Sequence, residues 1–218
     1  MKHNIVELLV GKFRELDKKF KSQYTLNDEF DEQLSVLKAA AWFMQIRSFL
    51  IGFLAEHEDH TEIFRELFAG LQSPDPYTRY CIVSSLEFFQ TPNPIPWLIP
   101  ALKDGDLQVR LAAVRAVSAS SESLQDFSAL DPLMERLNDN EARVRSQVAL
   151  ALWRLKNLKA VEPLIQRLKI ENDKDVQLTL DNSLMFLTGK RFFFGLIGGN
   201  YKRWSKWWEK EKKKTLTR

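Results

Sequence analysis

The sequence has little of what disulfide-stabilised, secreted or membrane-spanning proteins need. Its 218 residues include one cysteine, Cys81, which excludes an internal disulfide framework. The longest apolar stretch, residues 39–55, contains Gln45, Arg47 and Ser48 and is too short and too polar for a comfortable membrane span. Glu7 interrupts the short apolar run near the N-terminus, so no signal peptide is expected. These features predict a cytoplasmic protein.

The sequence also has little excess of positive over negative charge, except at the C-terminal end. The formal net charge is +3, which gives no reason to expect a polyanionic partner for the chain as a whole. Residues 190–218, however, contain ten Lys or Arg and two Glu, a local charge of +8, which leaves −5 for the rest. The C-terminal segment is therefore a separate candidate for electrostatic contacts.

What the sequence does contain is a repeated unit of 31–35 residues. Each unit combines two segments of helical apolar periodicity, separated by a polar turn. No unit could cover its own apolar faces, so the units must stack. We therefore predict four helix pairs between about residues 60 and 188, without β-sheet, in an all-α superhelix. The equivalent positions are Leu71, Leu102, Leu137 and Leu168 in the first helices, and Leu86, Val117, Leu152 and Leu184 in the second.

The turn within each unit places an acidic residue four positions before an arginine or glutamine. An acidic side chain at a helix start is favoured by the helix dipole, and a partner at i+4 adds to this. The recurrence predicts a structural ladder between repeats, formed by residues that could be mistaken for a basic recognition stripe. Its members are Asp75 and Arg79, Asp106 and Arg110, Glu141 and Arg145, and Asp173 and Gln177.

Three segments carry a resemblance to a known family: DGDLQVRLAAVRAV (104–117), NDNEARVRSQVALAL (138–152) and NDKDVQLTL (172–180). They resemble HEAT-like repeats, especially the short bacterial and phycobilin-lyase-type variety. The resemblance extends over about residues 60–190 and implies an α–α solenoid. The tail is similar to one that closes such arrays, with Leu187-Thr188-Gly189, an aromatic-glycine element and Trp204-x-x-Trp207-Trp208.

The segments before the repeats predict two helices. Residues 4–21 have one apolar side, and residues 37–54 are apolar on nearly all sides, as expected of a buried helix. We expect this pair to cover the first repeat, although a self-association or partner surface is the alternative. The predicted organisation is an N-terminal helical pair (1–58), HEAT-like repeats (59–189) and an aromatic, basic cap or tail (190–218), within one continuous domain.

Candidate catalytic motifs are few. His57 and His60 flank Glu58 and Asp59, but a catalytic metal needs a third ligand and an open position, and the spacing is not that of H-E-x-x-H. Cys81 has no histidine nearby in sequence and is predicted to be a small core residue. The glycines of GLIGGN (195–200) follow no predicted strand and match no phosphate-binding fingerprint. The sequence therefore predicts no catalytic residue, metal or cofactor.

The tail from Tyr201 combines aromatic and basic residues. Trp204, Trp207 and Trp208 lie on one side of a predicted helix, and we expect at least one of them to pack on the last repeat, with Lys212–Lys214 in solvent. Nucleic acid or an anionic membrane is the alternative partner, because cationic amphipathic helices bind either. The candidate contacts to an anionic surface are Lys202, Arg203, Lys206 and Lys210.

The resemblance implies that the second helix of each repeat lines the concave side of the solenoid. On that side the sequence interleaves aromatic residues and methionine with polar groups, a mixture typical of protein interfaces and unlike a uniformly basic nucleic-acid surface. The predicted partner-binding residues are Tyr80, Ser84, Glu87, Leu111, Arg115, Ser146, Leu150, Trp153, Leu178, Asn182 and Met185.

The sequence thus predicts a non-catalytic adaptor, scaffold or chaperone-like module that binds another protein or peptide segment on its concave face. A nucleic-acid-binding HEAT protein or HEAT-like DNA glycosylase is the first alternative. The tryptophan-rich segment with a nearby Asp, expected of such a glycosylase, is missing from the repeats. A phycobilin-lyase-like protein is the second alternative, suggested by repeat type alone. The oligomeric state stays open.

Overall fold

The chain is built from α-helices and short 3-10 turns. The computed structural model describes residues 4–23, 44–45, 48–50, 52, 60–89, 92–190 and 201–216, and none of these residues lies in a β-strand. They divide into two compact units, Met1–Phe89 and Gln90–Arg218. The fold is an all-α solenoid of helix pairs, as predicted.

The first unit contains α1 (Ile5–Gln23), α3 (His60–Gly70) and α4 (Pro76–Leu86). The Asn4 side chain accepts backbone N–H groups of the first turn of α1, which begins the helix. The apolar side of α1 is buried, with Leu9 and Phe13 fully inaccessible to solvent. It packs against both α3 and α4. Gly70 permits close packing at the end of α3, because a Cβ there would lie 2.5 Å from the Ile82 side chain of α4 and 3.2 Å from Val6 of α1.

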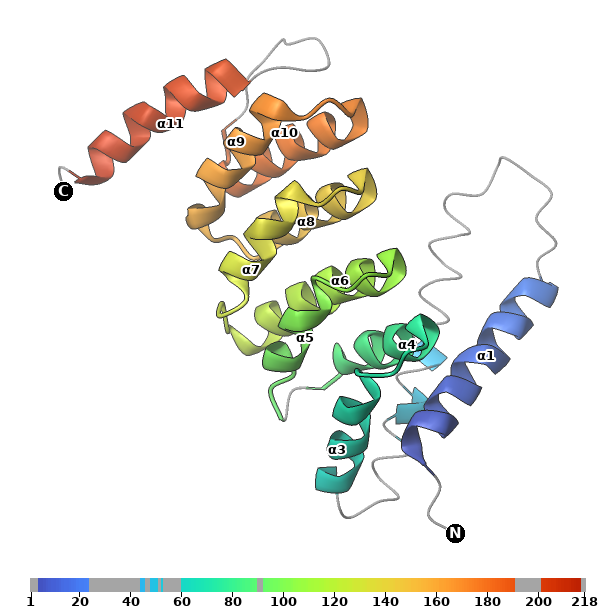
Figure 1. Cartoon of the computed structure of the whole chain (residues 1–218). Helices are drawn as coiled ribbons and strands as arrows, with labels where there is room; N and C mark the ends of the chain where they lie inside the picture. The colour runs from blue at the N-terminus through green and yellow to red at the C-terminus, as the bar shows by residue number, and fades with distance from the viewer. Residues whose placement is uncertain are drawn as a thin grey trace. The chain divides into compact units, whose positions relative to one another are not determined.

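The second unit contains three helix pairs and a terminal helix (Figure 1). The second helices α6, α8 and α10 lie side by side in chain order and make the most extensive inter-repeat contacts. The first pair is α5 (Ile95–Ala101) with α6 (Leu107–Leu124), and the second is α7 (Leu130–Glu135), continued by η1 (Arg136–Asn138), with α8 (Ala142–Arg154). After η2 (Leu158–Ala160), the third pair is α9 (Val161–Ile170) with α10 (Lys174–Thr188). The terminal helix α11 (Tyr201–Leu216) packs on α9.

Residues in the turns determine where the helices begin and end. Asp75, Asp106 and Asp173 each accept two backbone N–H groups at the start of the following helix. Glu141 precedes α8 without such a bond. Gly189 ends α10 in the left-handed conformation, with φ of 68°, which glycine adopts at little cost. The four predicted pairs, and the break at residues 104–106, are confirmed.

Several predictions fall on residues outside the described ranges. They include most of the second N-terminal helix (37–54), residues 57–59 and the side chain of His60, and the aromatic-glycine element (191–200). The boundaries proposed at residues 58 and 189 stay predictions. The division between the two compact units lies within the repeats, after α4.

Candidate functional site

The inter-repeat ladder is the most regular polar feature of the second unit. Arg110, at the start of α6, donates from Nε and Nη2 to the Asp139 carboxylate of the next repeat, at 3.0 and 3.2 Å. Its Nη1 donates to the Asp104 and Gly105 carbonyls of its own turn. One buried guanidinium thus ties two consecutive turns together.

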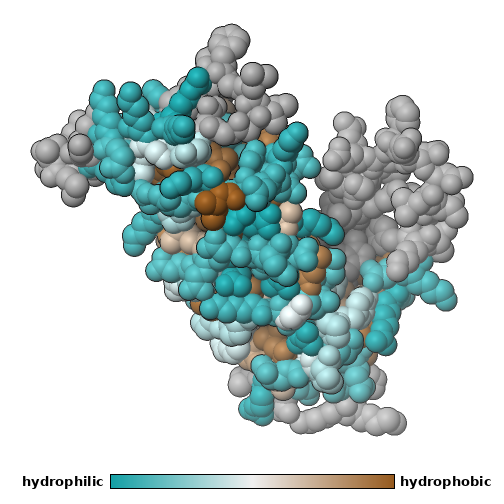
Figure 2. Space-filling model, turned by 45° about the horizontal axis from the view of Figure 1, so that its top comes forward, coloured by the Kyte–Doolittle hydropathy of each residue, from teal (hydrophilic) through white to brown (hydrophobic). Residues whose placement is uncertain are grey.

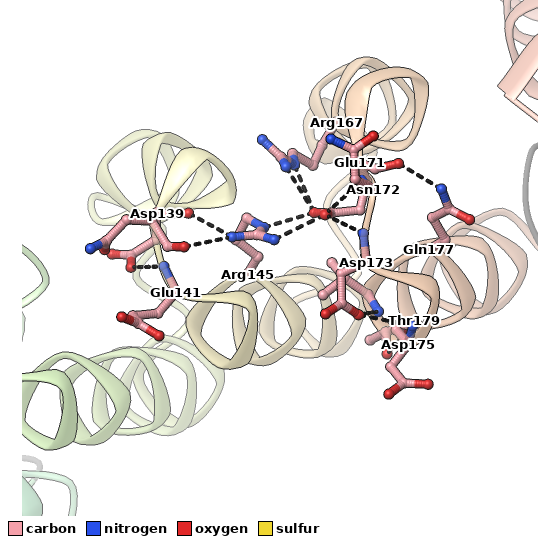
Figure 3. A network of polar contacts seen from close by, with 12 residues as sticks. Asp139, Glu141, Arg145, Arg167, Glu171, Asn172, Asp173, Asp175, Gln177 and Thr179 are labelled. Carbon is pink, nitrogen blue, oxygen red and sulfur yellow. Dashed lines mark hydrogen bonds and ion pairs between the residues drawn. The ribbon is translucent and has the colours of Figure 1, made fainter.

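Arg145 repeats this arrangement one unit later (Figure 3). It donates to both carboxylate oxygens of Glu171, at 2.7 and 2.9 Å, and to the Asp139 and Asn140 carbonyls. Arg167 adds a third guanidinium bond to Glu171. Burial raises the pKa of Glu171, but hydrogen bonds from Arg145, the Asp173 backbone and Arg167 outweigh it and lower the pKa to about 2.

The ladder ends at Gln177. Its side chain donates to the Glu171 carbonyl at 2.6 Å, six residues back, as Arg145 does to Asp139. In the first unit, Arg79 donates to the Ser73 carbonyl over the same interval. The turn-facing bond therefore recurs in all four repeats. The bond to the following turn is made by Arg110 and Arg145.

The contacts confirm the predicted ladder between repeats for Arg110 and Arg145 but correct their partners. The acid bound by Arg110 is Asp139, 29 residues away, and not Asp106 at i−4. Asp106 instead caps α6 through the N–H groups of Gln108 and Val109. The sequence pattern had paired neighbours along a helix, whereas the stacking of repeats brings the next turn closer.

In the first unit, α1 covers part of the predicted binding side of α4. The Phe13 ring meets the Tyr80 ring edge-on, with centroids 6.3 Å apart. The Tyr77 hydroxyl donates to the Asp17 carboxylate of α1 at 2.6 Å. Ser84 is fully buried and Glu87 half-buried. The prediction that Ser84 is a surface contact is therefore wrong, and the half-buried Tyr80 contacts the chain's own first helix.

In the second unit, most of the predicted partner-binding residues on α6 and α8 are half-buried. Leu111, Arg115 and Ser146 are half-buried. Near the C-terminal ends of these helices, an exposed ion pair joins α6 to α8, with 3.6 Å between Arg154 and Glu122. This part of the surface is mixed in charge.

Three large hydrophobic side chains on α8 and α10 are exposed, as are Leu158 in η2 and Ile170 at the end of α9. Leu150 is 40% exposed, Leu178 50% and Phe186 58%. The Trp153 and Phe186 rings lie 5.3 Å apart, bridging the two helices. Asn182 and Met185, on α10, are half-buried. We call the group formed by Leu150, Trp153, Leu178, Met185 and Phe186 the α8–α10 face.

Sequence reasoning missed Phe186. It lies one position after Met185, to the side of the predicted row, and reaches Trp153 because α8 packs against α10. On a helix, Met185 at i+7 is nearly in line with Leu178, whereas Phe186 at i+8 is rotated by about 80°, so helical spacing gave no clear signal for it. Figure 2 shows a surface that is mostly hydrophilic, with hydrophobic patches that are small and separate. At the surface, the exposed Phe186 and the half-buried Trp153 join α10 to α8.

Two side-chain contacts attach the C-terminal helix α11 to the last helix pair. Trp204 is 1% exposed, and its indole N–H donates to Asp181 of α10 at 2.6 Å. Lys212 donates to Glu162 of α9 at 2.6 Å, and this hydrogen bond lowers the pKa of Glu162. The predicted tryptophan cap is confirmed. Lys212, which was expected in solvent, is half-exposed but paired with Glu162, and the side chains of Lys213 and Lys214 lie outside the described residues. The candidate contacts Lys202, Arg203, Lys206 and Lys210 are exposed on α11.

The remaining candidate chemistry is limited. Cys81 is fully buried, and burial raises the pKa of its thiol, as the core interpretation requires. Within the described ranges, no three His, Cys, Asp or Glu side chains come together as a metal site. None of the helices that the structure describes is long and apolar enough to cross a bilayer.

The comparison with known families agrees with this architecture. A family model described as HEAT repeats matches residues 64–127 and 95–184, which together span more than half of the chain. No curated protein matches the sequence. Repeats of this kind commonly serve as protein-interaction scaffolds. The chain therefore belongs to the HEAT-repeat family.

Proposed function

We propose that this protein is a non-catalytic scaffold that binds a segment of another protein on the α8–α10 face. The observation that carries the proposal is the exposure of Leu178 and Phe186, on the side of α10 turned away from its buried residues. Exposed apolar groups that gather on one surface commonly mark interaction sites, and aromatic residues and methionine are enriched there. A cytoplasmic location is part of the proposal.

Two matched variants test it. Leu178→Asp places a charge on the α8–α10 face, and Leu158→Asp places one in η2, outside α8 and α10, at a residue of similar exposure, 53%. Burying one leucine is worth about 1.5–3 kcal/mol, so we expect Leu178→Asp to weaken partner binding at least about tenfold. The measurement is quantitative affinity capture from native cells with wild type and each variant. Identical capture by all three proteins would exclude this face.

A second candidate activity has one observation in its favour. The exposed side of α11 presents Lys202, Arg203, Lys206 and Lys210. We propose that it contacts an anionic surface, nucleic acid or membrane, by charge alone. Replacing Lys202, Lys206 and Lys210 with Glu should abolish salt-sensitive retention by phosphatidylserine vesicles or a single-stranded oligonucleotide. No retention of wild type by either probe at low salt would reject this activity.

The DNA-glycosylase and phycobilin-lyase alternatives have less support. Among the described residues, those on the second helices of the second unit form a surface of mixed charge, as the Arg154–Glu122 pair illustrates. A DNA-binding face would be dominated by basic side chains. Protein binding is the function that the exposed apolar residues support best.

A further inference from the structure

The chain carries its own example of an amphipathic helix packed on a repeat, because α1 lies against both α3 and α4. In the first unit, α1 lies against α4 with its apolar side, and Phe13 contacts the Tyr80 ring. Polar bonds at its margin orient it, including the Tyr77 hydroxyl to Asp17 and the backbone N–H of Ile5 to Glu66 at 2.9 Å. An amphipathic helix is therefore a segment that this type of surface can hold.

The ladder shows which positions of the other repeats are equivalent to Tyr80. Arg79, Arg145 and Gln177 each donate to the carbonyl six residues before them, so they occupy the same place in their repeats. The residue that follows Arg79 is Tyr80, and the residue that follows Gln177 is Leu178. Tyr80 contacts α1, whereas Leu178 is 50% exposed.

A second equivalent position shows the same contrast. Ser84 lies five residues after Arg79, and Leu150 lies five residues after Arg145. Ser84 is fully buried, whereas Leu150 is 40% exposed. The two exposed residues at these positions, Leu150 and Leu178, are thus both leucines. The other equivalent positions of α8 and α10 hold the half-buried polar residues Ser146 and Asn182.

The chemistry of the face also favours a helix as its occupant. The α8–α10 face consists of side chains on two helices whose backbone groups are already hydrogen-bonded within each helix. It offers no strand edge that could pair with an extended peptide. A bound helix satisfies its own backbone hydrogen bonds and can therefore bury an apolar side without leaving buried polar groups unpaired.

We infer that the α8–α10 face binds a single amphipathic α-helix of the partner protein, an inference that rests on the proposed function. From Leu178 to Phe186 the face extends over eight residues of α10, about 12 Å at 1.5 Å per residue. Two to three turns of helix match this length. The bound helix therefore presents apolar residues at i, i+4 and i+7, and one of them is aromatic, as Phe13 is in α1.

The experiment selects peptides against the whole chain. A displayed library of random 16-residue peptides is enriched on the wild-type protein, and the selected peptides are then measured for affinity. We expect an i, i+4, i+7 apolar pattern, unchanged affinity for Leu158→Asp, and at least tenfold weaker binding to Leu178→Asp. Phe186→Ala is the second variant, and thermal melts verify that all three proteins are folded.

A proline scan of the selected peptides identifies their bound conformation. A proline at a central, outward-facing position should weaken binding about 100-fold, because it disrupts the interior of a helix. Peptides that tolerate this proline but still lose affinity for Leu178→Asp would overturn the helix inference and leave the proposed function standing. If no peptide is sensitive to either face variant, both fail.

A second copy of the chain is the competing occupant. Sedimentation of the full chain distinguishes it, because self-association through this face would disappear in Leu178→Asp and persist in Leu158→Asp. That result would assign the face to a homodimer and overturn the inference of a helical partner segment. A wild-type monomer at the concentrations used for peptide binding supports the inference.

Discussion

Arg110 and Arg145 each use one guanidinium to bind carbonyls of their own turn and a carboxylate of the following one. Both arginines are buried, and their acidic partners are still less exposed. A planar guanidinium suits this geometry because its donors are held in a fixed fork, whereas a lysine would supply a point charge. The two arginine side chains therefore link consecutive repeats and, being buried, offer little surface to a partner.

The first prediction concerns Arg110→Ala. It leaves the buried Asp139 carboxylate without its guanidinium, and removing one partner of a buried pair costs about 3 kcal/mol. Urea unfolding should show this loss, while the affinity for a selected peptide stays unchanged. Arg154→Ala is the control, because its pair with Glu122 is exposed and should contribute less than about 1 kcal/mol. Equal losses in both variants would contradict a special role for the ladder.

The second prediction is the pH dependence carried by Glu171. Its pKa is about 2 in the folded chain, against an ordinary value of 4.5, so folding favours the ionised form. The resulting stabilisation is complete above pH 4.5 and is lost as the pH falls toward 2; its size is about 3 kcal/mol. The difference in unfolding free energy between wild type and Glu171→Gln should therefore shrink over this interval. A constant difference would show that Glu171 titrates normally.

At the scale of elements, α11 is a cap whose two attachments differ in kind. Trp204 buries a large indole and satisfies its N–H with Asp181, whereas Lys212 makes a half-exposed ion pair with Glu162. Aromatic burial is worth far more than an exposed pair. The cap therefore depends mainly on Trp204.

The third prediction follows from this asymmetry. Trp204→Ala should lower the unfolding free energy by about 3–5 kcal/mol, as large-to-small substitutions of buried aromatics do. Lys212→Ala should cost less than about 1 kcal/mol. Thermal or urea unfolding of the two variants gives the comparison. A larger effect of Lys212→Ala would mean that the ion pair, and not the indole, holds α11.

The elements themselves could be predicted from the sequence because each signal was local. Apolar periodicity located the helix pairs, and Asp106 and Asp173 marked helix starts through bonds to backbone groups two and three residues away. Contacts that depend on stacking could not be obtained in this way. Arg110 reaches an acid 29 residues distant, and Lys212 one that is 50 residues distant.

The candidate binding residues were predictable only in part for the same reason. Helical spacing placed Leu178 on the outward side of α10, where it is exposed. Spacing alone carried no information that Ser84 would be buried or that Phe186 would meet Trp153. Those outcomes depend on which helix packs against which, and this is decided by tertiary contacts.

At the scale of the second unit, each repeat contacts mainly its neighbours. Helix α8 packs between α6 and α10, whereas α11 packs on α9 and reaches α10 through Trp204. In such arrays, stability is a sum of terms within repeats and between adjacent ones. A local change should therefore affect nearby helices first.

The fourth prediction tests this by hydrogen exchange in Trp204→Ala. Amide exchange should accelerate in α11, α9 and α10, while α6, two repeats away from the cap, keeps its protection. Local opening at the end of a linear array does not require the remaining repeats to open. Mass spectrometry of proteolytic fragments resolves these segments. Equal acceleration in every helix would show instead that the unit unfolds as a single cooperative block.

Residue 177 is a glutamine at the position where the other three repeats have an arginine, and this limits the extension of the array by further repeats. A further hairpin, or another copy placed end to end, would find no guanidinium at this position to bind its turn carboxylate. Arg145 uses separate nitrogens for the carbonyl and the next carboxylate, whereas Gln177 has a single amide nitrogen, which donates to the Glu171 carbonyl. The neighbouring Asp181 is engaged by the indole of Trp204. Head-to-tail contacts that do not close generate open filaments. We therefore expect Gln177 and Trp204 to disfavour the addition of another repeat at α10.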